Sequence, residues 1–191
     1  MTTRSLRSLA QVCGFFGLLL GLLAIASFIP ASPTFAATTS FRVSLPLIMS
    51  VRTEVAIASA AETQAVELTN QLRQQHGCQP LHVSPELTAA ARAHSQDMAD
   101  HNYFAHTDLA GHHSDWRAQQ AGYTGIAGWE NIGAGYQTAE QMVNGWYNET
   151  PPNDGHRRNL LNCSLTEVGI GYAANTNSDY GIYWTQDFGT H

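Results

Sequence analysis

Four short blocks in the second half of the sequence carry side chains that could do chemistry. They hold two histidines and two glutamates beside aromatic residues and glycine: YFAH (103–106), WENI (129–132), GWYNE (145–149) and DGHRRN (154–159). Such neighbours favour side chains that are fixed by packing at the floor of a cleft. Two imidazoles with nearby carboxylates suit a borderline divalent ion, Zn²⁺ first among them. A glutamate that does not bind the metal can orient an imidazole through its second nitrogen.

The spacing of these residues is not that of a dedicated metalloenzyme. The sequence has no His-Glu-x-x-His motif and no third obvious metal ligand. The same side chains can instead form a hydrogen-bonded polar network that supports a cleft without any metal. Both interpretations stay open at this stage.

The blocks, in this order, resemble the SCP/PR-1-like secreted domains of the CAP superfamily, most closely its bacterial members. The resemblance extends from about residue 61 to residue 188 and includes NQLR (70–73), ARAHSQDMA (91–99), VGIGY (168–172) and YWTQDF (183–188). It implies an α+β fold: an α-β-α sandwich with a small antiparallel sheet between two helical layers and a cleft across the sheet.

The cleft of CAP domains carries a tetrad of two histidines and two glutamates. Matched motif by motif, the resemblance implies that the tetrad here is His106, Glu130, Glu149 and His156. We expect His106 and His156 to be the metal ligands if a divalent cation such as Zn²⁺ binds. Many bacterial relatives have serine at the position of Glu149, so this sequence resembles the members with a complete tetrad.

Other polar residues near these blocks have simpler interpretations. His94 falls at helical spacing within a buried stripe, which predicts a core histidine rather than a ligand. His112 and His113 follow His106 in a loop and could line the cleft or add a ligand. Arg157 and Asn159 flank His156, and we expect them to pin that segment by hydrogen bonds.

Local signals predict the elements that position the blocks. We expect helices over 61–76, from Pro85 behind a Ser84 cap, over about 115–121, and from a capping box at 138–141 through Trp146. We expect strands over 167–173 and 180–188, joined by a cluster of turn-forming residues.

The first 36 residues have the features of a secretory signal. Arg4 and Arg7 precede an uncharged run over 12–29, followed by prolines and a small-residue site near 34–37. The run is also long enough to span a bilayer, so an uncleaved membrane anchor is the alternative. We expect cleavage and a secreted, extracellular protein, with residues 37–60 as a linker or a short strand and 61–191 as the domain.

The charge of the chain restricts its partners. The sequence has no lysine, and loss of Arg4 and Arg7 with the leader would leave seven arginines against 15 acidic residues, a net charge of about −8. Such a field repels nucleic acid and anionic lipid, and no basic stripe offsets it. We therefore expect no nucleic-acid partner, and membrane contact only if the leader is uncleaved. We expect a monomer with an extracellular ligand that the sequence does not name.

Two cysteines remain once the leader, with Cys13, is set aside. An even pair in an oxidising compartment predicts a disulfide between Cys78 and Cys163, and two free buried thiols are the alternative. The resemblance supports the bridge, because related bacterial domains use the same pair.

Three functions fit these observations. The first is a binding module for a peptide, glycan or lipid, with the tetrad as an ion-sensitive support. The second is an extracellular hydrolase, either a metal-dependent peptidase with Glu130 or Glu149 as base or a two-carboxylate cell-wall glycosidase. The sequence lacks a Gly-x-Ser-x-Gly elbow and both mature cysteines are expected in a bridge, so binding is favoured over catalysis. The third is a wall- or membrane-tethered structural module, which needs an uncleaved leader or an interaction through residues 37–60.

Overall fold

The computed structural model describes residues 45–191, with side chains described from residue 60 onward. The predicted secretory signal over 1–36 lies outside the described residues. The elements are α1 (Leu45–Gln75), β1 (His82–Val83), α2 (Pro85–His101), α3 (Ser114–Gln120), β2 (Ile126–Ala134), α4 (Ala139–Tyr147), α5 (Gly155–Leu160), β3 (Glu167–Ala174) and β4 (Ile182–Thr190).

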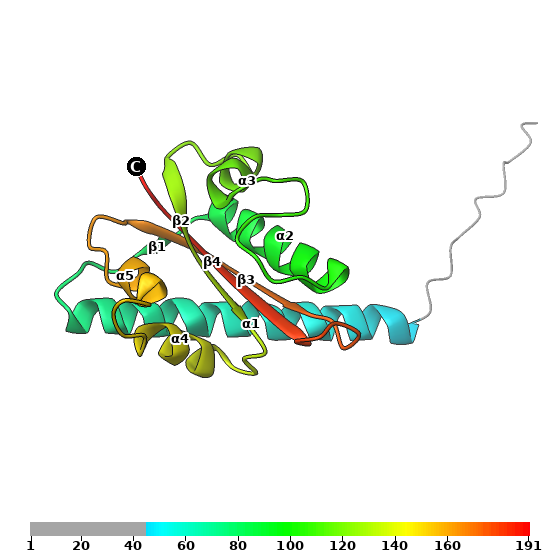
Figure 1. The fold of residues 1–191 in the computed structure, drawn as a ribbon. Coiled ribbons are helices and arrows are strands. Elements are labelled where there is room, and N and C mark those ends of the chain that lie inside the picture. Colours follow the sequence, from blue (N-terminus) through cyan, green and yellow to red (C-terminus); the bar gives the residue numbers. More distant parts are fainter. Residues whose placement is uncertain (1–44) are drawn as a thin grey trace, which may run out of the picture. The chain divides into compact units, whose positions relative to one another are not determined.

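A four-stranded sheet lies between two layers of helices, which confirms the predicted α-β-α sandwich. Figure 1 shows α1, α4 and α5 on one side of the sheet and α2 and α3 on the other. The strand order is β1-β3-β4-β2. The pairs β3–β4 and β4–β2 are antiparallel as expected, whereas the short β1 pairs in parallel with β3, so the sheet is mixed.

Side-chain caps start α2 and α4 where the sequence predicts. The Ser84 hydroxyl accepts a hydrogen bond from the Leu87 amide, and Pro85 occupies the first turn, where its missing N–H costs nothing. The Thr138 hydroxyl accepts from the Gln141 amide in the same way. These caps satisfy amides that have no partner within the helix and so fix where each helix begins.

The first helix starts earlier than the sequence analysis expects. Helix α1 begins at Leu45 rather than at residue 61, so the described part of the segment 37–60 is helical and not a strand. Pro46 argues against a central strand, but it is tolerated in the first turn of a helix, and the run after it is rich in alanine. Two strands, β1 and β2, and the short helix α5 were not predicted at all.

The core is divided by the sheet. Trp146, Leu160, Trp184 and Phe188 are buried on the α1/α4/α5 side, and Met98, Ile132 and Tyr183 form a second cluster on the α2 side. Helix α2 approaches β3 so closely that only glycine fits at two positions. A Cβ at Gly169 would lie 2.1 Å from the Leu87 carbonyl carbon, and one at Gly171 would lie 2.2 Å from that of Ala91.

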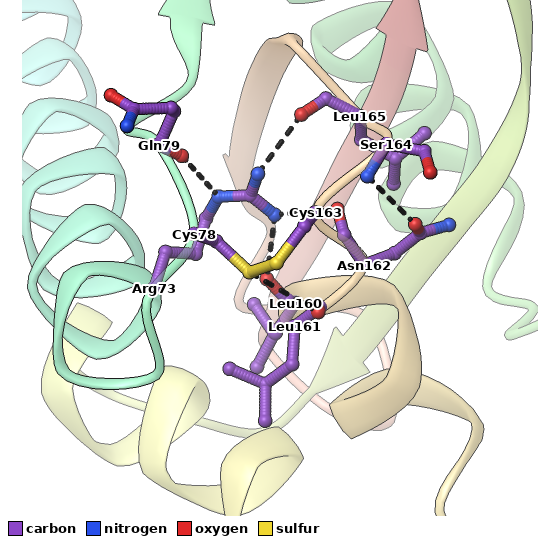
Figure 2. The surroundings of a disulfide bond; sticks show 9 residues. All are labelled: Arg73, Cys78, Gln79, Leu160, Leu161, Asn162, Cys163, Ser164 and Leu165. Atoms are coloured by element: carbon purple, nitrogen blue, oxygen red, sulfur yellow. Dashed lines mark hydrogen bonds between the residues drawn. A yellow bond between two sulfur atoms is a disulfide. The ribbon is translucent and has the colours of Figure 1, made fainter.

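A buried arginine and a disulfide join the end of α1 to the segment between α5 and β3, as Figure 2 shows. Arg73 is fully buried and donates to the carbonyl oxygens of Gln79, Leu160, Asn162 and Leu165 at 2.9–3.1 Å. Burial lowers the pKa of Arg73, and the four carbonyl dipoles take the place of water around its charge. The Cys78–Cys163 disulfide lies beside it, which confirms the predicted bridge.

Loss of the bridge should destabilise the fold. The cysteines are 85 residues apart, so the bridge restricts a long loop of the unfolded chain, and removing a native disulfide typically costs about 2 to 5 kcal/mol. We expect the double substitution Cys78→Ala, Cys163→Ala to lower the free energy of unfolding by this amount in urea titrations. Reductant should destabilise the wild type and leave the double variant unchanged. Equal urea midpoints for oxidised and reduced wild type would contradict the prediction.

Candidate functional site

The site is built around the edge strand β2, where the two helical layers meet. A β-bulge at Gly128, whose φ is 130°, precedes Trp129 and shifts the register of β2 against β4. From there the side chains alternate as in any strand. Trp129 and Asn131 belong to the α4/α5 side, and Glu130 faces α3 on the other side.

The first histidine–glutamate pair joins the loop after α2 to this strand. The Nδ1 atom of His106 lies 2.6 Å from Glu130 Oε1. The Glu130 side chain is only 4% exposed, whereas that of His106 is 52% exposed. A buried carboxylate therefore holds a largely exposed imidazole in one orientation.

Arg117 of α3 neutralises Glu130 and fixes the loop that carries His106. Its guanidinium is buried and hydrogen-bonds to Glu130 Oε2. The same guanidinium donates to the carbonyl oxygens of His106 at 3.1 Å and of His112 at 2.9 Å. The buried guanidinium of Arg117 thus links α3 to β2 and to the loop that carries His106.

The second pair comes from the α4/α5 side of the sheet. Glu149, two residues after α4 ends, accepts from His156 Nδ1 at 2.5 Å and from the His156 amide at 3.0 Å. Because His156 lies in the first turn of α5, Glu149 orients the imidazole and satisfies a free helix amide at once.

The two pairs meet across β2 with their rings 6.3 Å apart, centre to centre. Asn159 holds this arrangement, because its amide donates to the Glu130 carbonyl at 3.1 Å and to Asn131 Oδ1 at 2.9 Å. The Asn131 amide in turn donates to the His156 carbonyl at 3.2 Å. Both histidines donate through Nδ1, so each keeps its Nε2 for other partners.

Three adjoining hollows, together called the groove, surround these residues. The first, of about 390 Å³, lies over His106, His113, Asp115, Trp129, Glu130 and Asn159. The second, of about 430 Å³, is lined by His106, Glu130, Glu149, Asn153, His156 and Asn159. The third, of about 540 Å³, lies over Trp129, Asp154, Arg157, Arg158, Asn159 and Asn162. Asn159 lines all three, so the hollows adjoin one another.

The four predicted tetrad residues are therefore brought together, but as two pairs rather than as one set of ligands. Within the described part of the chain, no three or more His, Cys, Asp or Glu side chains are grouped so as to hold a metal ion. Each glutamate binds the Nδ1 atom of its histidine, the arrangement by which carboxylates support metal-bound imidazoles. A cation at this site would bind His106 and His156 through Nε2.

Three further histidines, His94, His112 and His113, lie near the tetrad, and one of them lines the groove. His94 is buried, as expected, and its Nε2 lies 3.0 Å from the Ala105 carbonyl. Burial lowers the pKa of His94, although the negative charge of Glu130 opposes this effect. His113 lines the first hollow of the groove, whereas His112 stacks on Trp116 at 3.6 Å.

The comparisons with known proteins show the family of this chain. Residues 66–188 match the model of CAP, the cysteine-rich secretory protein family. The chain belongs to the CAP family. It is 39% identical to the uncharacterized protein YkwD of Bacillus subtilis over 130 residues, which cover 68% of this chain and 47% of YkwD. It is 33% identical to the uncharacterized membrane protein YlbC of the same organism over 141 residues, 69% of this chain and 35% of YlbC.

A solved CAP structure shows the same fold. An extracellular protein of Bacillus anthracis that contains an SCP domain superimposes with a TM-score of 0.61 at 31% identity, covering 71% of this chain and 42% of that one. The chain thus spans less than half the length of each of these relatives. Among the described residues, no helix of this CAP chain is long and apolar enough to cross a membrane.

Sequence reasoning missed two residues of the CAP site, Arg117 and Asp187. Arg117 lies in a short helix with no motif around it. Only its positive charge, opposite to the charge of Glu130, could have suggested that the two side chains pair. Asp187 pairs with Glu130 in the register of β4 against β2. A carboxylate inside the strand block YWTQDF was the available signal, since an aspartate in a central strand needs a reason.

Asp187 is fully buried, and neither of its oxygens has a hydrogen-bond donor among the described residues. Burial raises the pKa of Asp187 well above its ordinary value, the charge of Glu130 raises it further, and Arg117 opposes the shift. A protonated Asp187 can donate a hydrogen bond to the adjacent Glu130. The raised pKa favours the protonated form of Asp187 in the folded protein more than in the unfolded chain.

The substitution Asp187→Asn should remove a pH dependence of stability. A raised pKa in the folded state means that wild-type stability is greatest below the unfolded value, about pH 4, and falls as the pH rises towards the folded value. Asparagine keeps the shape and a donor but has no proton to lose. We expect Asp187→Asn to melt at a higher temperature than wild type at pH 7 and this advantage to shrink towards pH 4.

Thermal melts from pH 3 to 8 measure this difference, with Asp179→Asn as the control because Asp179 lies exposed in the turn before β4. The control should follow the wild type throughout. A wild-type curve parallel to that of Asp187→Asn would show that folding does not raise the pKa of Asp187.

Proposed function

We propose that this chain is an extracellular binding module whose groove recognises a polar ligand with the help of a divalent cation, Zn²⁺ by ligand type. The observation that carries the proposal is the pair of imidazoles in the groove. Each has its Nδ1 atom held by a glutamate, and neither Nε2 is hydrogen-bonded to another described residue. Two oriented imidazole nitrogens with vacant neighbouring positions suit a cation that also binds a ligand.

His106 and His156 would hold the cation, and Glu130 and Glu149 would orient them. When bound, such an ion supplies a Lewis-acidic centre for an oxygen atom of the ligand. The residues around the groove contribute mostly polar groups. The first two hollows are lined by His, Ser, Asp, Glu, Asn and Arg side chains, together with Gly128, Gly155 and Trp129. This lining favours a peptide or a glycan over the acyl chain of a lipid.

The contacts of Glu130 weigh against the alternative function, a hydrolase. A general base or a glycosidase carboxylate must reach its substrate within hydrogen-bond distance. Glu130 is almost wholly buried, and its two oxygens are engaged by His106 and Arg117. Glu149 is likewise engaged, by the ring and the amide of His156. Both glutamates are better placed to position imidazoles than to attack a substrate.

Titration of the oxidised, metal-stripped protein with Zn²⁺ in a calorimeter tests the proposal. We expect one ion per chain with a dissociation constant in the micromolar range or tighter, because two oriented imidazoles bind it. The substitutions His106→Ala and His156→Ala should each weaken binding strongly, and their combination should abolish it. His82→Ala serves as the matched control, since His82 is exposed on β1 and lies outside the groove.

Thermal melts of the same variants separate the two interpretations of the tetrad. Retained melting temperatures with lost Zn²⁺ affinity support a cation site. Absence of binding at millimolar Zn²⁺, or equal affinity in the double variant, would overturn it and leave a polar network that supports the groove.

A further inference from the structure

The third hollow of the groove differs from the other two in charge. The charged side chains that line it are Arg157, Arg158 and Asp154, so two cations face one anion. This excess of positive charge occurs in a chain with a formal net charge of −6. An anionic group would be drawn to this end of the groove.

The guanidinium of Arg157 has unused hydrogen-bonding capacity. Its Nε atom is buried without a hydrogen-bond partner among the described residues, and its guanidinium carbon lies 5.1 Å from the centre of the Tyr147 ring. Arg158 is 70% exposed, and its contact with Asp154 is a long one, 3.5 Å from Nε to Oδ1. The sequence analysis expects both Arg157 and Asn159 to pin this segment by hydrogen bonds. Asn159 does so, whereas Arg157 Nε has no partner among the described residues.

The other arginines with described side chains are already engaged. Arg73 is bound by backbone carbonyls, Arg92 by Glu62 and Arg117 by Glu130. A planar guanidinium with free donors matches a carboxylate, which can accept two parallel hydrogen bonds from it.

We propose that Arg157 and Arg158 form a subsite for the carboxylate group of an acidic sugar chain that lies along the groove. The proposal rests on the binding function proposed above and names the chemistry of its ligand. Trp129 lines both the first and the third hollow, so an aromatic side chain stands where a sugar ring would lie. Asn153, Asn159 and Asn162 line the second and third hollows with amides that suit hydroxyl groups.

The backbone of β2 favours a sugar over an extended peptide. A peptide that binds beside an edge strand usually adds as another strand through main-chain hydrogen bonds. Here the Glu130 carbonyl accepts from Asn159, and the Ile132 carbonyl accepts from the Trp146 indole at 3.0 Å. Side chains thus already bond to these two backbone carbonyls of the edge strand, and few acceptors remain for the main chain of an added strand.

Calorimetry of the full chain in EDTA, with hexagalacturonate as the probe, tests the subsite apart from any metal. We expect binding that weakens with added NaCl and that is at least about tenfold weaker for the methyl ester of the same oligomer, which lacks the charge. Arg157→Gln and Arg158→Gln should each reduce the affinity by about tenfold. Arg92→Gln, which changes an arginine of α2 that pairs with Glu62, should bind as wild type does.

Because Arg157 packs on Tyr147, its variant is compared with Arg158→Gln, whose exposed side chain can change without disturbing the fold. Equal binding of the acid and its ester, full affinity in both groove variants, or no binding of hexagalacturonate would overturn the subsite. So would binding of a hexaglutamate peptide alone, which would make the ligand a peptide. Zn²⁺ affinity in the same variants should match the wild type, so failure of the subsite and failure of the cation site give different results.

Discussion

The burial of one carboxylate, Glu130, is the constraint on which the site depends. A lone buried charge is expensive, and removal of one partner from a buried ion pair typically costs about 3 to 5 kcal/mol. Glu130 is therefore surrounded by compensating groups: Arg117 on one oxygen, His106 on the other, and Asp187, which can donate a hydrogen bond when it is protonated. Each comes from a different element, so satisfying this one group brings α3, the loop after α2, β2 and β4 into register.

The other half of the site is held by polar contacts along the face of the sheet that packs on α1 and α5. Asn131 of β2 contacts Asn159 of α5 and Gln186 of β4, and the Gln186 amide reaches Thr69 of α1 at 3.0 Å. Asn131, Gln186 and Thr69 are fully buried, so mismatched partners for their polar groups would be costly. Arg73 and the disulfide then fix the end of α5, which carries His156 at its other end. These internal contacts determine the shape of the groove.

Local signals were enough to predict the parts of the fold that depend on local chemistry. The caps at Ser84 and Thr138 and the two long C-terminal strands follow from neighbouring residues in the sequence, and the structure has them. The start of α1 was not predicted because Pro46, which disfavours a central strand, is also compatible with the first turn of a helix. Strand β2 was missed because its glycines and its buried Glu130 and Asn131 hide the alternation expected of a strand.

The candidate site could be predicted in its members but not in its pairing. The blocks identified His106, Glu130, Glu149 and His156, yet nothing in their spacing indicates which glutamate supports which histidine. Arg117 and Asp187 became visible only through long-range partners, because their roles follow from the register of β2 against β4 and from the packing of α3. Sequence reveals such residues only when the charge that they compensate is already known.

The groove has a buried floor and an exposed rim, and this division bears on how such domains diversify. Glu130 and Asn131 are buried in the floor, whereas His113, Asp115, Asn153 and Arg158 lie exposed at loops or in a short helix. Substitutions in the floor disturb folding, but substitutions at the rim change what the groove touches at little cost in stability. Two chains can therefore share this floor and recognise different molecules. Ligand specificity should follow the rim residues of each chain rather than overall likeness between chains.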